Sequence, residues 1–256
     1  MVSDAERARS FGAIADDYDR ARPGPPEVAV DWLVPEHAHT VVDLGAGTGL
    51  LSRALTRKVP QVVAVEPDPR MRAVLAARSP GVRVLEGTGE AIPLPGASVD
   101  GVFVSSAWHW MDPDRAIPEI ARVLRDGGRF GVIWTHRDHQ AGWLHDLGRA
   151  RVDTNTDPGS LTRSRRHDVR LPEGGLFEHI TTETFRFTHT TTVDGFVAWH
   201  ATYSHMITAS PGEREAELAR LRAALAERFP GAEQLDVPMR SRCWRADRVL
   251  NQRQSA

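Results

Sequence analysis

Residues 41–49 read Val-Val-Asp-Leu-Gly-Ala-Gly-Thr-Gly, a strand-like run that leads into a glycine loop and opens a helix. Glycines in such a loop let the backbone approach a ligand closely, and the free amides of the helix N-terminus face that ligand. About twenty residues further on, Glu66 ends the next strand-like run, where a carboxylate can accept both hydroxyl groups of a ribose. This combination predicts an α/β fold with a nucleoside-binding edge.

Strand-like and helix-like runs alternate outward from this loop. Short β-branched runs separated by helices of about ten residues are typical of a parallel sheet that helices cover on both faces. The expected strands are 40–44, 61–65, 82–85, 101–104, 130–134, 181–190 and roughly 237–246, and the first expected helices are 50–57, 69–78 and 113–125. We therefore expect a Rossmann-like, seven-stranded, mostly parallel sheet with helices on both faces.

The remaining segments are expected to form a helical cap within a single domain that spans residues 1–256. The alternation of strand-like and helix-like runs stops at residues 138–175, which we interpret as a polar, arginine-rich helix-plus-loop insertion. Residues 193–230 are expected to complete the cap. Ser210 and Glu213 have the spacing of a capping box. The helix that follows carries apolar residues on one face, at Leu218, Leu221, Leu225 and Phe229.

The composition excludes several classes of protein. A single cysteine, Cys243, rules out a disulfide scaffold, and a 41% hydrophobic share over 256 residues predicts a sizeable core. A net charge of −2 gives no pull toward nucleic acid or anionic membrane. The N-terminal segment, where Ser3 and Glu6 have capping-box spacing, lacks the apolar run of a signal peptide, and no segment approaches the roughly 18 apolar residues of a membrane span. We therefore expect a cytoplasmic monomer or homodimer without nucleic-acid or membrane partners.

Spacing separates the cofactor classes that use a glycine loop of this kind. A dinucleotide fingerprint needs G-x-G-x-x-G/A, but the sixth position counted from Gly45 is Leu50, whereas G-x-G-x-G fits. A P-loop needs Lys followed by Ser or Thr, and the only lysine, Lys58, precedes Val59. The Tyr-x-x-x-Lys catalytic pair of nicotinamide dehydrogenases is also excluded. It needs a tyrosine four residues before the lysine, and the residue four positions before Lys58 is Ala54. The loop therefore carries no diphosphate signature.

Five stretches of the sequence together resemble one known family. They are residues 11–26, 41–49, 65–71, 86–95 and 107–112, which read FGAIADDYDRARPGPP, VVDLGAGTG, VEPDPRM, EGTGEAIPLP and AWHWMD. Over roughly residues 11–136 the chain resembles class I S-adenosylmethionine-dependent methyltransferases, in particular the small-molecule branch with ubiquinone/menaquinone and trans-aconitate methyltransferase relatives. The resemblance implies S-adenosylmethionine as cofactor, S-adenosylhomocysteine as product and a small-molecule methyl acceptor.

The resemblance also implies which residues contact the cofactor. The implied set is Tyr18, Arg22, Asp43, Gly45, Ala46, Gly47, Glu66, Pro67, Met71, Thr88, Gly89, Glu90 and Ser105. Glu66 would hold the ribose, and Pro67 and Met71 would pack against the adenine. Thr88 stands where the family has an aspartate, so its hydroxyl or the Gly89 backbone must take the adenine amino group. The planar donor fork of Arg22 would pair with the cofactor carboxylate, with a surface charge as the alternative.

Methyl transfer from a sulfonium is an in-line displacement, so the protein chiefly aligns donor and acceptor. His109 is the candidate general base, because ligands of open α/β folds bind at the carboxyl ends of the strands, and the fourth strand ends just before it. A structural or substrate-shaping role for His109 is the alternative. Further candidate acceptor contacts, with core packing or buried hydrogen bonding as the alternative, are Trp108, Trp110, Tyr203 and His205.

The acceptor is expected to be a small metabolite, with O-methylation favoured over N- or C-methylation. Relatives that methylate DNA or RNA amino groups carry Asn/Asp-Pro-Pro-Tyr after the fourth strand, and this chain has Ser-Ser-Ala-Trp at 105–108. Two alternatives to methyl transfer stay open, a non-methylating enzyme such as a cyclase and a non-catalytic binding protein on the same fold.

Two further clusters of polar residues are candidate sites. His136 and His139 have helical metal-ligand spacing, but no cysteine or carboxylate set completes four ligands, so no metal is expected. An arginine cluster could attract a carboxylate or phosphate on the substrate or form a solvated loop, and its members are Arg163, Arg165, Arg166 and Arg170.

Overall fold

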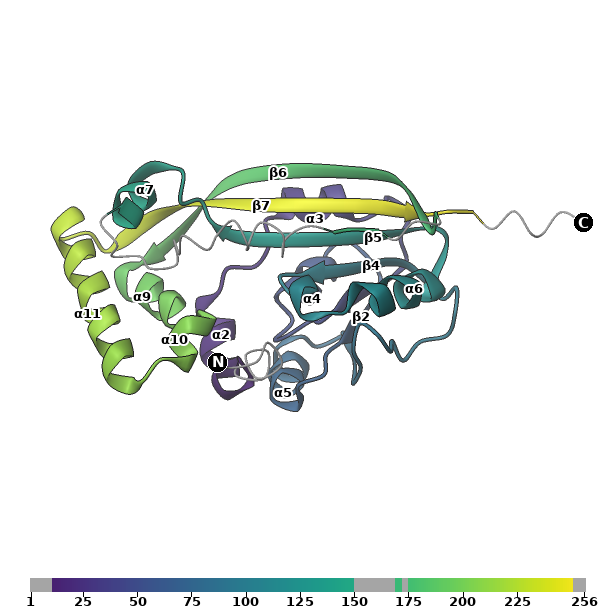
Figure 1. Cartoon of the computed structure of the whole chain (residues 1–256), viewed down its shortest axis with the longest axis horizontal. Coiled ribbons are helices and arrows are strands. Elements are labelled where there is room, and N and C mark those ends of the chain that lie inside the picture. The colour runs from purple at the N-terminus through teal and green to yellow at the C-terminus, as the bar shows by residue number, and fades with distance from the viewer. Residues whose placement is uncertain (1–10, 150–168, 172–174, 251–256) are drawn as a thin grey trace, which may run out of the picture. The chain divides into compact units, whose positions relative to one another are not determined.

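The computed structural model describes residues 11–149, 169–171 and 175–250 (Figure 1). The first half holds η1 Phe11–Ile14, α2 Ala15–Ala21, α3 Glu27–Leu33, β1 Thr40–Leu44, α4 Leu50–Leu55, β2 Gln61–Val65, α5 Pro69–Arg78, β3 Arg83–Leu85, β4 Val99–Ser105 and η2 Trp108–Trp110. The second half holds α6 Pro113–Val123, β5 Leu124–Arg137, α7 Gly142–Arg149, β6 Phe177–Thr192, α9 Val193–Ala201, α10 Ser204–Thr208, α11 Pro211–Arg228 and β7 Gln234–Arg248.

The seven strands of the described residues form one sheet in the order β3-β2-β1-β4-β5-β7-β6. The pairs β2–β3, β1–β2, β1–β4 and β4–β5 are all parallel. Their carboxyl ends therefore meet at one edge, where Leu44 of β1 lies beside Val65 of β2. The Rossmann-like, seven-stranded, mostly parallel sheet expected from the sequence is confirmed.

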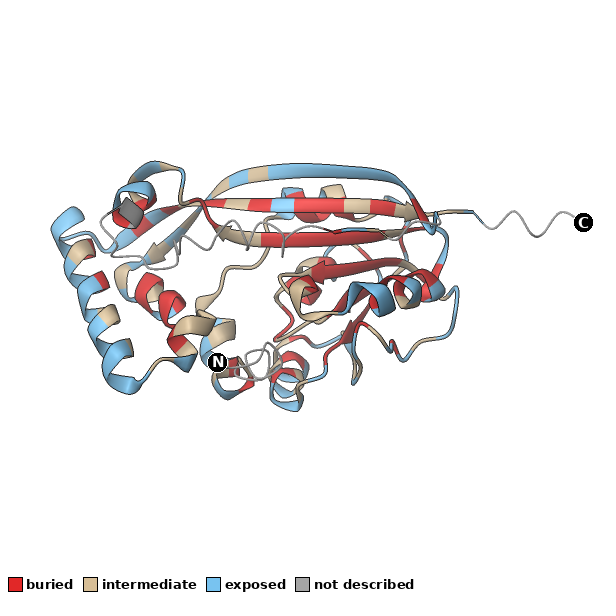
Figure 2. Cartoon of the chain, in the orientation of Figure 1, coloured by how far each residue is buried: buried red, intermediate tan, exposed pale blue. Residues whose placement is uncertain are grey.

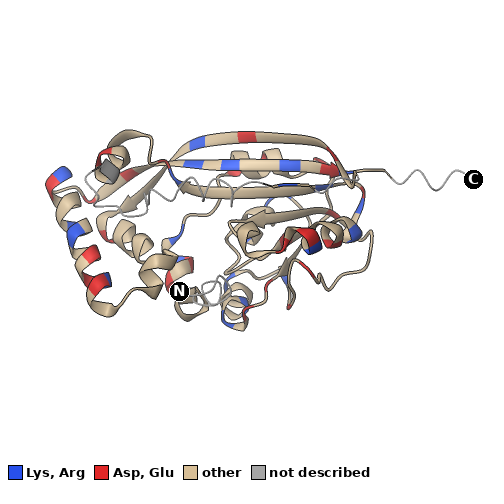
Figure 3. Ribbon diagram, in the orientation of Figure 1, with Lys and Arg blue, Asp and Glu red and all other residues tan. Residues whose placement is uncertain are grey.

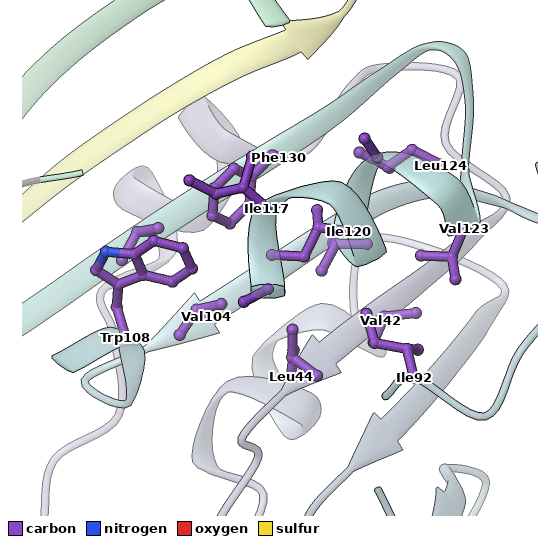
Figure 4. Packing of buried hydrophobic residues seen from close by; sticks show 14 of the residues in the cluster. Val42, Leu44, Ile92, Val104, Trp108, Ile117, Ile120, Val123, Leu124 and Phe130 are labelled. Atoms are coloured by element: carbon purple, nitrogen blue, oxygen red, sulfur yellow. The ribbon is translucent and has the colours of Figure 1, made fainter. Parts of the chain in front are cut away.

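Alternate residues of β1 pack on opposite faces of the sheet, which is why this strand is hydrophobic almost throughout. Val42 and Leu44 belong to a buried cluster with Ile117 and Ile120 of α6 (Figure 4). Val41 belongs to a second cluster, with residues of α3 and α4. Helices therefore cover both faces, as the alternation of strand and helix predicts.

The chain divides into two compact units, and each has its own hydrophobic core. Unit 1 comprises Met1–Pro23, His136–Arg166 and Arg186–Arg240, and unit 2 comprises Gly24–Thr135, His167–Phe185 and Ser241–Ala256. The two clusters on β1 lie in unit 2, whereas a third cluster, built from α7, α9, α11 and β7, lies in unit 1. Strands β5, β6 and β7 each contribute residues to both units. The expected single domain and its cap segments stay predictions.

The helix that the sequence places at residues 113–125 is confirmed as α6, although it ends earlier. The Asp112 side chain accepts a hydrogen bond from the Asp114 amide, and Pro113 fills the first turn, where a missing N–H costs nothing. The helix ends at Val123, two residues before the expected end, because Leu124 already pairs with Val99 of β4.

The long helix α11 begins at the expected capping box. Ser210 and Glu213 each accept a hydrogen bond from the other's backbone amide, which satisfies two amides of the first turn. Leu221 and Leu225 are buried on one face of α11, and its exposed residues include charged side chains of both signs (Figures 2 and 3). The amphipathic pattern is therefore confirmed.

Two expectations lie outside the described residues. They are the capping box at Ser3 and Glu6 and the first three arginines of the cluster at 163–170. Within the described residues, no helix combines the length and the apolar character needed to cross a membrane.

Candidate functional site

The glycine loop after β1 is shaped by three glycines in the left-handed region. Gly45, Gly47 and Gly49 have φ angles of 68°, 57° and 87°, which other residues adopt only with strain. The backbone amides of Gly45 and Ala46 donate to the Val65 carbonyl at 2.8 and 3.2 Å. The loop is thereby attached to the end of β2, one residue before Glu66.

The three glycines differ in what surrounds them. A Cβ atom at Gly45 would lie 2.8 Å from the Ala107 Cβ, and one at Gly49 would lie 2.9 Å from Leu75 Cγ. A Cβ atom at Gly47 would meet nothing within 4 Å. Gly45 and Gly49 therefore serve close packing inside unit 2, whereas Gly47 presents its backbone to open space.

The carboxylate of Glu66 is fixed by backbone amides on two sides. Its Oε2 accepts from the Gly47 amide and its Oε1 from the Asp68 amide, both at 2.9 Å. The side chain of Arg72 donates to the Glu66 and Pro67 carbonyls at 2.9 and 2.7 Å and so holds the same turn. Burial raises the pKa of Glu66, and the two amide hydrogen bonds oppose that rise.

A second acid, Asp43, lies at the end of β1 and is fully buried. Its Oδ2 accepts from the Ser52 hydroxyl at 2.6 Å, while its Oδ1 has no hydrogen-bond partner among the described residues. Burial raises the pKa of Asp43 to about 7, although the Ser52 hydrogen bond lowers it. The loop thus lies between two buried carboxyl groups, one of which has unused acceptor capacity.

The loops after β3 and β4 meet at Met111. A Cβ atom at Gly89 would lie 2.6 Å from the Met111 sulfur, and one at Gly45 would lie 3.1 Å from the Met111 methyl carbon. Glu90 accepts from the Asp112 amide at 2.8 Å, which connects the same two loops. Thr88 is exposed and forms an isolated bridge with Ala91.

Ser105 ends β4, and the chain then turns sharply into η2. Ser106 has a φ of 55°, a strained value for a residue other than glycine, and its amide donates to the Ile133 carbonyl at 2.9 Å. Trp108 is buried and packs on Phe130, with ring centroids 5.3 Å apart. His109 is half-buried beside Trp110, with ring centroids 4.4 Å apart.

Four of the sequence-predicted site residues lie in unit 1. Arg22 donates from Nε to the Thr202 hydroxyl at 2.8 Å and lies over the rings of Tyr18 and Tyr203. Tyr203 also stacks on His205, with centroids 6.0 Å apart. Unit 1 therefore brings these four predicted residues into one cluster, and their roles toward cofactor and acceptor stay predictions.

Comparison with known proteins decides the family. A family model described as "Methyltransferase domain" matches residues 42–132. An uncharacterized methyltransferase of Mycobacterium tuberculosis is 44% identical over 217 residues, which cover 85% of this chain and 86% of that protein. The chain belongs to the class I S-adenosylmethionine-dependent methyltransferases.

Solved methyltransferase structures share the fold. A protein of Anaeromyxobacter dehalogenans described as a type II methyltransferase has a TM-score of 0.66 at 26% identity, over 90% of this chain and 99% of that one. Phosphoethanolamine N-methyltransferase 2 of Haemonchus contortus has a TM-score of 0.53 at 13% identity, over 97% of this chain and 61% of that one. The Haemonchus structure holds phosphomonomethylethanolamine and S-adenosylhomocysteine.

The geometry of unit 2 fits the cofactor of a class I methyltransferase. Open space at Gly47 admits a ligand against the backbone, and the adjoining Glu66 carboxylate can accept ribose hydroxyls. The buried Oδ1 of Asp43 offers acceptor capacity beneath the loop. Met71 is buried in α5, and Pro67, four residues earlier, is exposed.

Sequence reasoning missed the role of Met111 in this methyltransferase. Its residue type and position carry no spacing signal, although it lies within the stretch 107–112 that carries the family resemblance. Only the fold shows that it packs against both Gly45 and Gly89. Met111 thereby fills the space between the loop after β1 and the loop after β3 without being part of either.

Proposed function

We propose that this methyltransferase binds S-adenosylmethionine at the glycine loop and transfers its methyl group to a small organic metabolite, with an oxygen acceptor favoured over nitrogen or carbon. The observation that carries the proposal is the contact between the Gly47 amide and the Glu66 carboxylate at 2.9 Å. It supports the proposal because an open stretch of backbone and a carboxylate that could accept ribose hydroxyls lie next to each other at the carboxyl edge of the sheet.

Bound S-adenosylmethionine supplies a methyl group already activated on a sulfonium, so the chain's own residues chiefly bind and orient the two reactants. Glu66 would accept from both ribose hydroxyls, and Gly45, Ala46 and Gly47 would line the methionine part. Met71 would pack on the adenine, whose amino group would be taken by the Thr88 hydroxyl or the Gly89 backbone. The carboxyl groups at this end of the sheet suit a cofactor that carries cationic centres.

His109 is proposed as the general base for an oxygen acceptor. It follows β4 at the same edge of the sheet as the glycine loop, in unit 2. An imidazole there would take the proton that a hydroxyl acceptor loses as its oxygen forms the new bond to the methyl carbon. Trp108 is buried, so it supports η2 through packing, while Trp110 is a proposed acceptor contact.

Calorimetry with S-adenosylhomocysteine tests the cofactor site. We expect Glu66→Gln to weaken binding at least about tenfold, because each neutralised charge-assisted hydrogen bond is worth roughly 1.5–3 kcal/mol. Glu36→Gln is the matched control, since Glu36 is an exposed carboxylate that precedes β1 and so lies away from the carboxyl edge of the sheet. Unchanged affinity in Glu66→Gln would contradict the ribose assignment.

A labelled-methyl screen over classes of hydroxyl, amine and acidic-carbon metabolites tests the reaction and its acceptor. We expect a product one methyl heavier, formed together with S-adenosylhomocysteine. His109→Gln should lower kcat and remove the alkaline rise of the pH–rate profile while leaving S-adenosylhomocysteine affinity intact. Cofactor binding without methyl transfer to any class would point to the cyclase-like or non-catalytic alternative.

A further inference from the structure

Three helices of unit 1 bring two imidazoles and one carboxylate together. His200 comes from the last turn of α9, His205 from α10 and Glu217 from α11. We call these three residues the histidine cluster. Their ligand-type atoms all lie within 4.8 Å of one another. No contiguous motif encodes this arrangement, because the three residues come together only when the helices pack.

The spacing of the donor atoms suits one small cation. Glu217 Oε1 lies 2.8 Å from His200 Nε2 and 3.4 Å from His205 Nε2. Atoms bound tetrahedrally at roughly 2.0–2.1 Å from zinc lie roughly 3.3 Å from one another. The two distances bracket that value, so the carboxylate oxygen lies close enough to each imidazole nitrogen for the pair to share one ion.

The burial of the three side chains is graded. His200 is fully buried, Glu217 is 14% exposed and His205 is 38% exposed. The histidine cluster therefore has one anchored ligand and one side that solvent reaches. Three protein ligands with an open position for water are the set typical of two-His, one-carboxylate zinc sites.

Arg137 contacts Nδ1 of His200, the ring nitrogen that does not face Glu217. The Arg137 guanidinium is buried, donates from Nε to the Tyr203 hydroxyl at 3.0 Å and lies 3.3 Å from His200 Nδ1. Since a guanidinium only donates, Nδ1 accepts, and neutral His200 carries its proton on Nε2, toward Glu217. A metal ion would replace that proton, and the imidazole proton would move to Nδ1.

We propose that the histidine cluster is a binding site for a divalent transition metal of the zinc class. Two imidazoles select zinc, cobalt or nickel over calcium and magnesium, which require oxygen ligands. The Arg137 donor opposes the Nδ1 proton that a metal-bound His200 needs, so it moderates the affinity of the site. The bound ion would connect the ends of α9 and α10 to α11. This site lies within unit 1. It shares His205 with the candidate acceptor contacts, and metal binding can be measured separately from methyl transfer.

Calorimetric titration of the tag-free, chelator-treated full chain with Zn²⁺, repeated with Co²⁺ and visible absorption, tests the site. We expect one ion per chain, tetrahedral cobalt bands, and at least tenfold weaker binding in both His205→Ala and Glu217→Gln. His145→Ala is the matched control, because His145 lies beside Asp146 on the surface of the same unit, and its binding should equal that of the wild type. The absence of saturable binding, or affinity unchanged in His205→Ala, overturns the proposal, and circular dichroism confirms that each variant is folded.

Discussion

Replacing Gly47 by alanine separates ligand contact from backbone strain. At a φ of 57° a Cβ costs about 1–2 kcal/mol of stability, and the new methyl group meets no protein atom within 4 Å. It would instead occupy the space that we assign to the cofactor. We therefore expect Gly47→Ala to lose about 1–2 kcal/mol in urea unfolding and at least tenfold, about 1.4 kcal/mol, in S-adenosylhomocysteine affinity.

Gly81→Ala is the matched control for strain alone. Gly81 has a φ of 91°, a Cβ atom added there would also meet nothing within 4 Å, and the residue precedes β3 at the opposite edge of the sheet. This variant should lose similar stability and keep its full affinity. The reasoning is refuted if Gly47→Ala binds S-adenosylhomocysteine like the wild type, or if Gly81→Ala loses as much affinity.

Three further perturbations test other parts of the structure. At pH values between 3.8, the ordinary pKa of the carboxyl group, and about 7, its pKa in the folded protein, Asp43 is protonated to a greater extent in the folded chain than in the unfolded chain. The free energy of unfolding should therefore fall with rising pH, by at most about 1.4 kcal/mol per unit. Urea unfolding at pH 5 and pH 8 measures this difference in the free energy of unfolding, and Asp43→Asn should make the difference smaller. A difference equal to that of the wild type would contradict the raised pKa of Asp43. Ser210→Ala removes the cap of α11 and should cost about 1 kcal/mol in urea unfolding without changing S-adenosylhomocysteine affinity. Arg137→Gln offers a carbonyl acceptor to His200 Nδ1 and should tighten zinc binding about tenfold in calorimetry, whereas weaker binding would refute the tautomer assignment.

The sequence predicted the parts of the site that lie close together along the chain. Residues 41–49 form a strand, a loop and the start of a helix, so their spacing alone indicates how the backbone turns. The position of Glu66 near the glycine loop was predictable in the same way, because Glu66 comes directly after the next parallel strand. Local propensity and hydrophobic period determine such features, and the structure confirms the strand, the loop and the acid.

Features that depend on packing between distant segments were not predictable. The last three strands were expected to be shorter than they are. In β6 the residues between Phe177 and Phe185 are all exposed and show no apolar alternation, so the start of the strand at Phe177 was not predicted. Met111 and Arg137 are likewise ordinary residue types in ordinary positions. Their contacts appear only when separate loops or helices fold together, which no periodicity records.

The position of β7 in the sheet has a consequence for synthesis of the chain. This strand, residues 234–248, lies between β5 and β6, which are both made before it. Until β7 emerges, β5 lacks one of its two sheet neighbours and β6 lacks the only one it has. Unpaired backbone groups of such strands can pair with other chains. Completion of the sheet therefore waits for β7, long after the glycine loop has been translated.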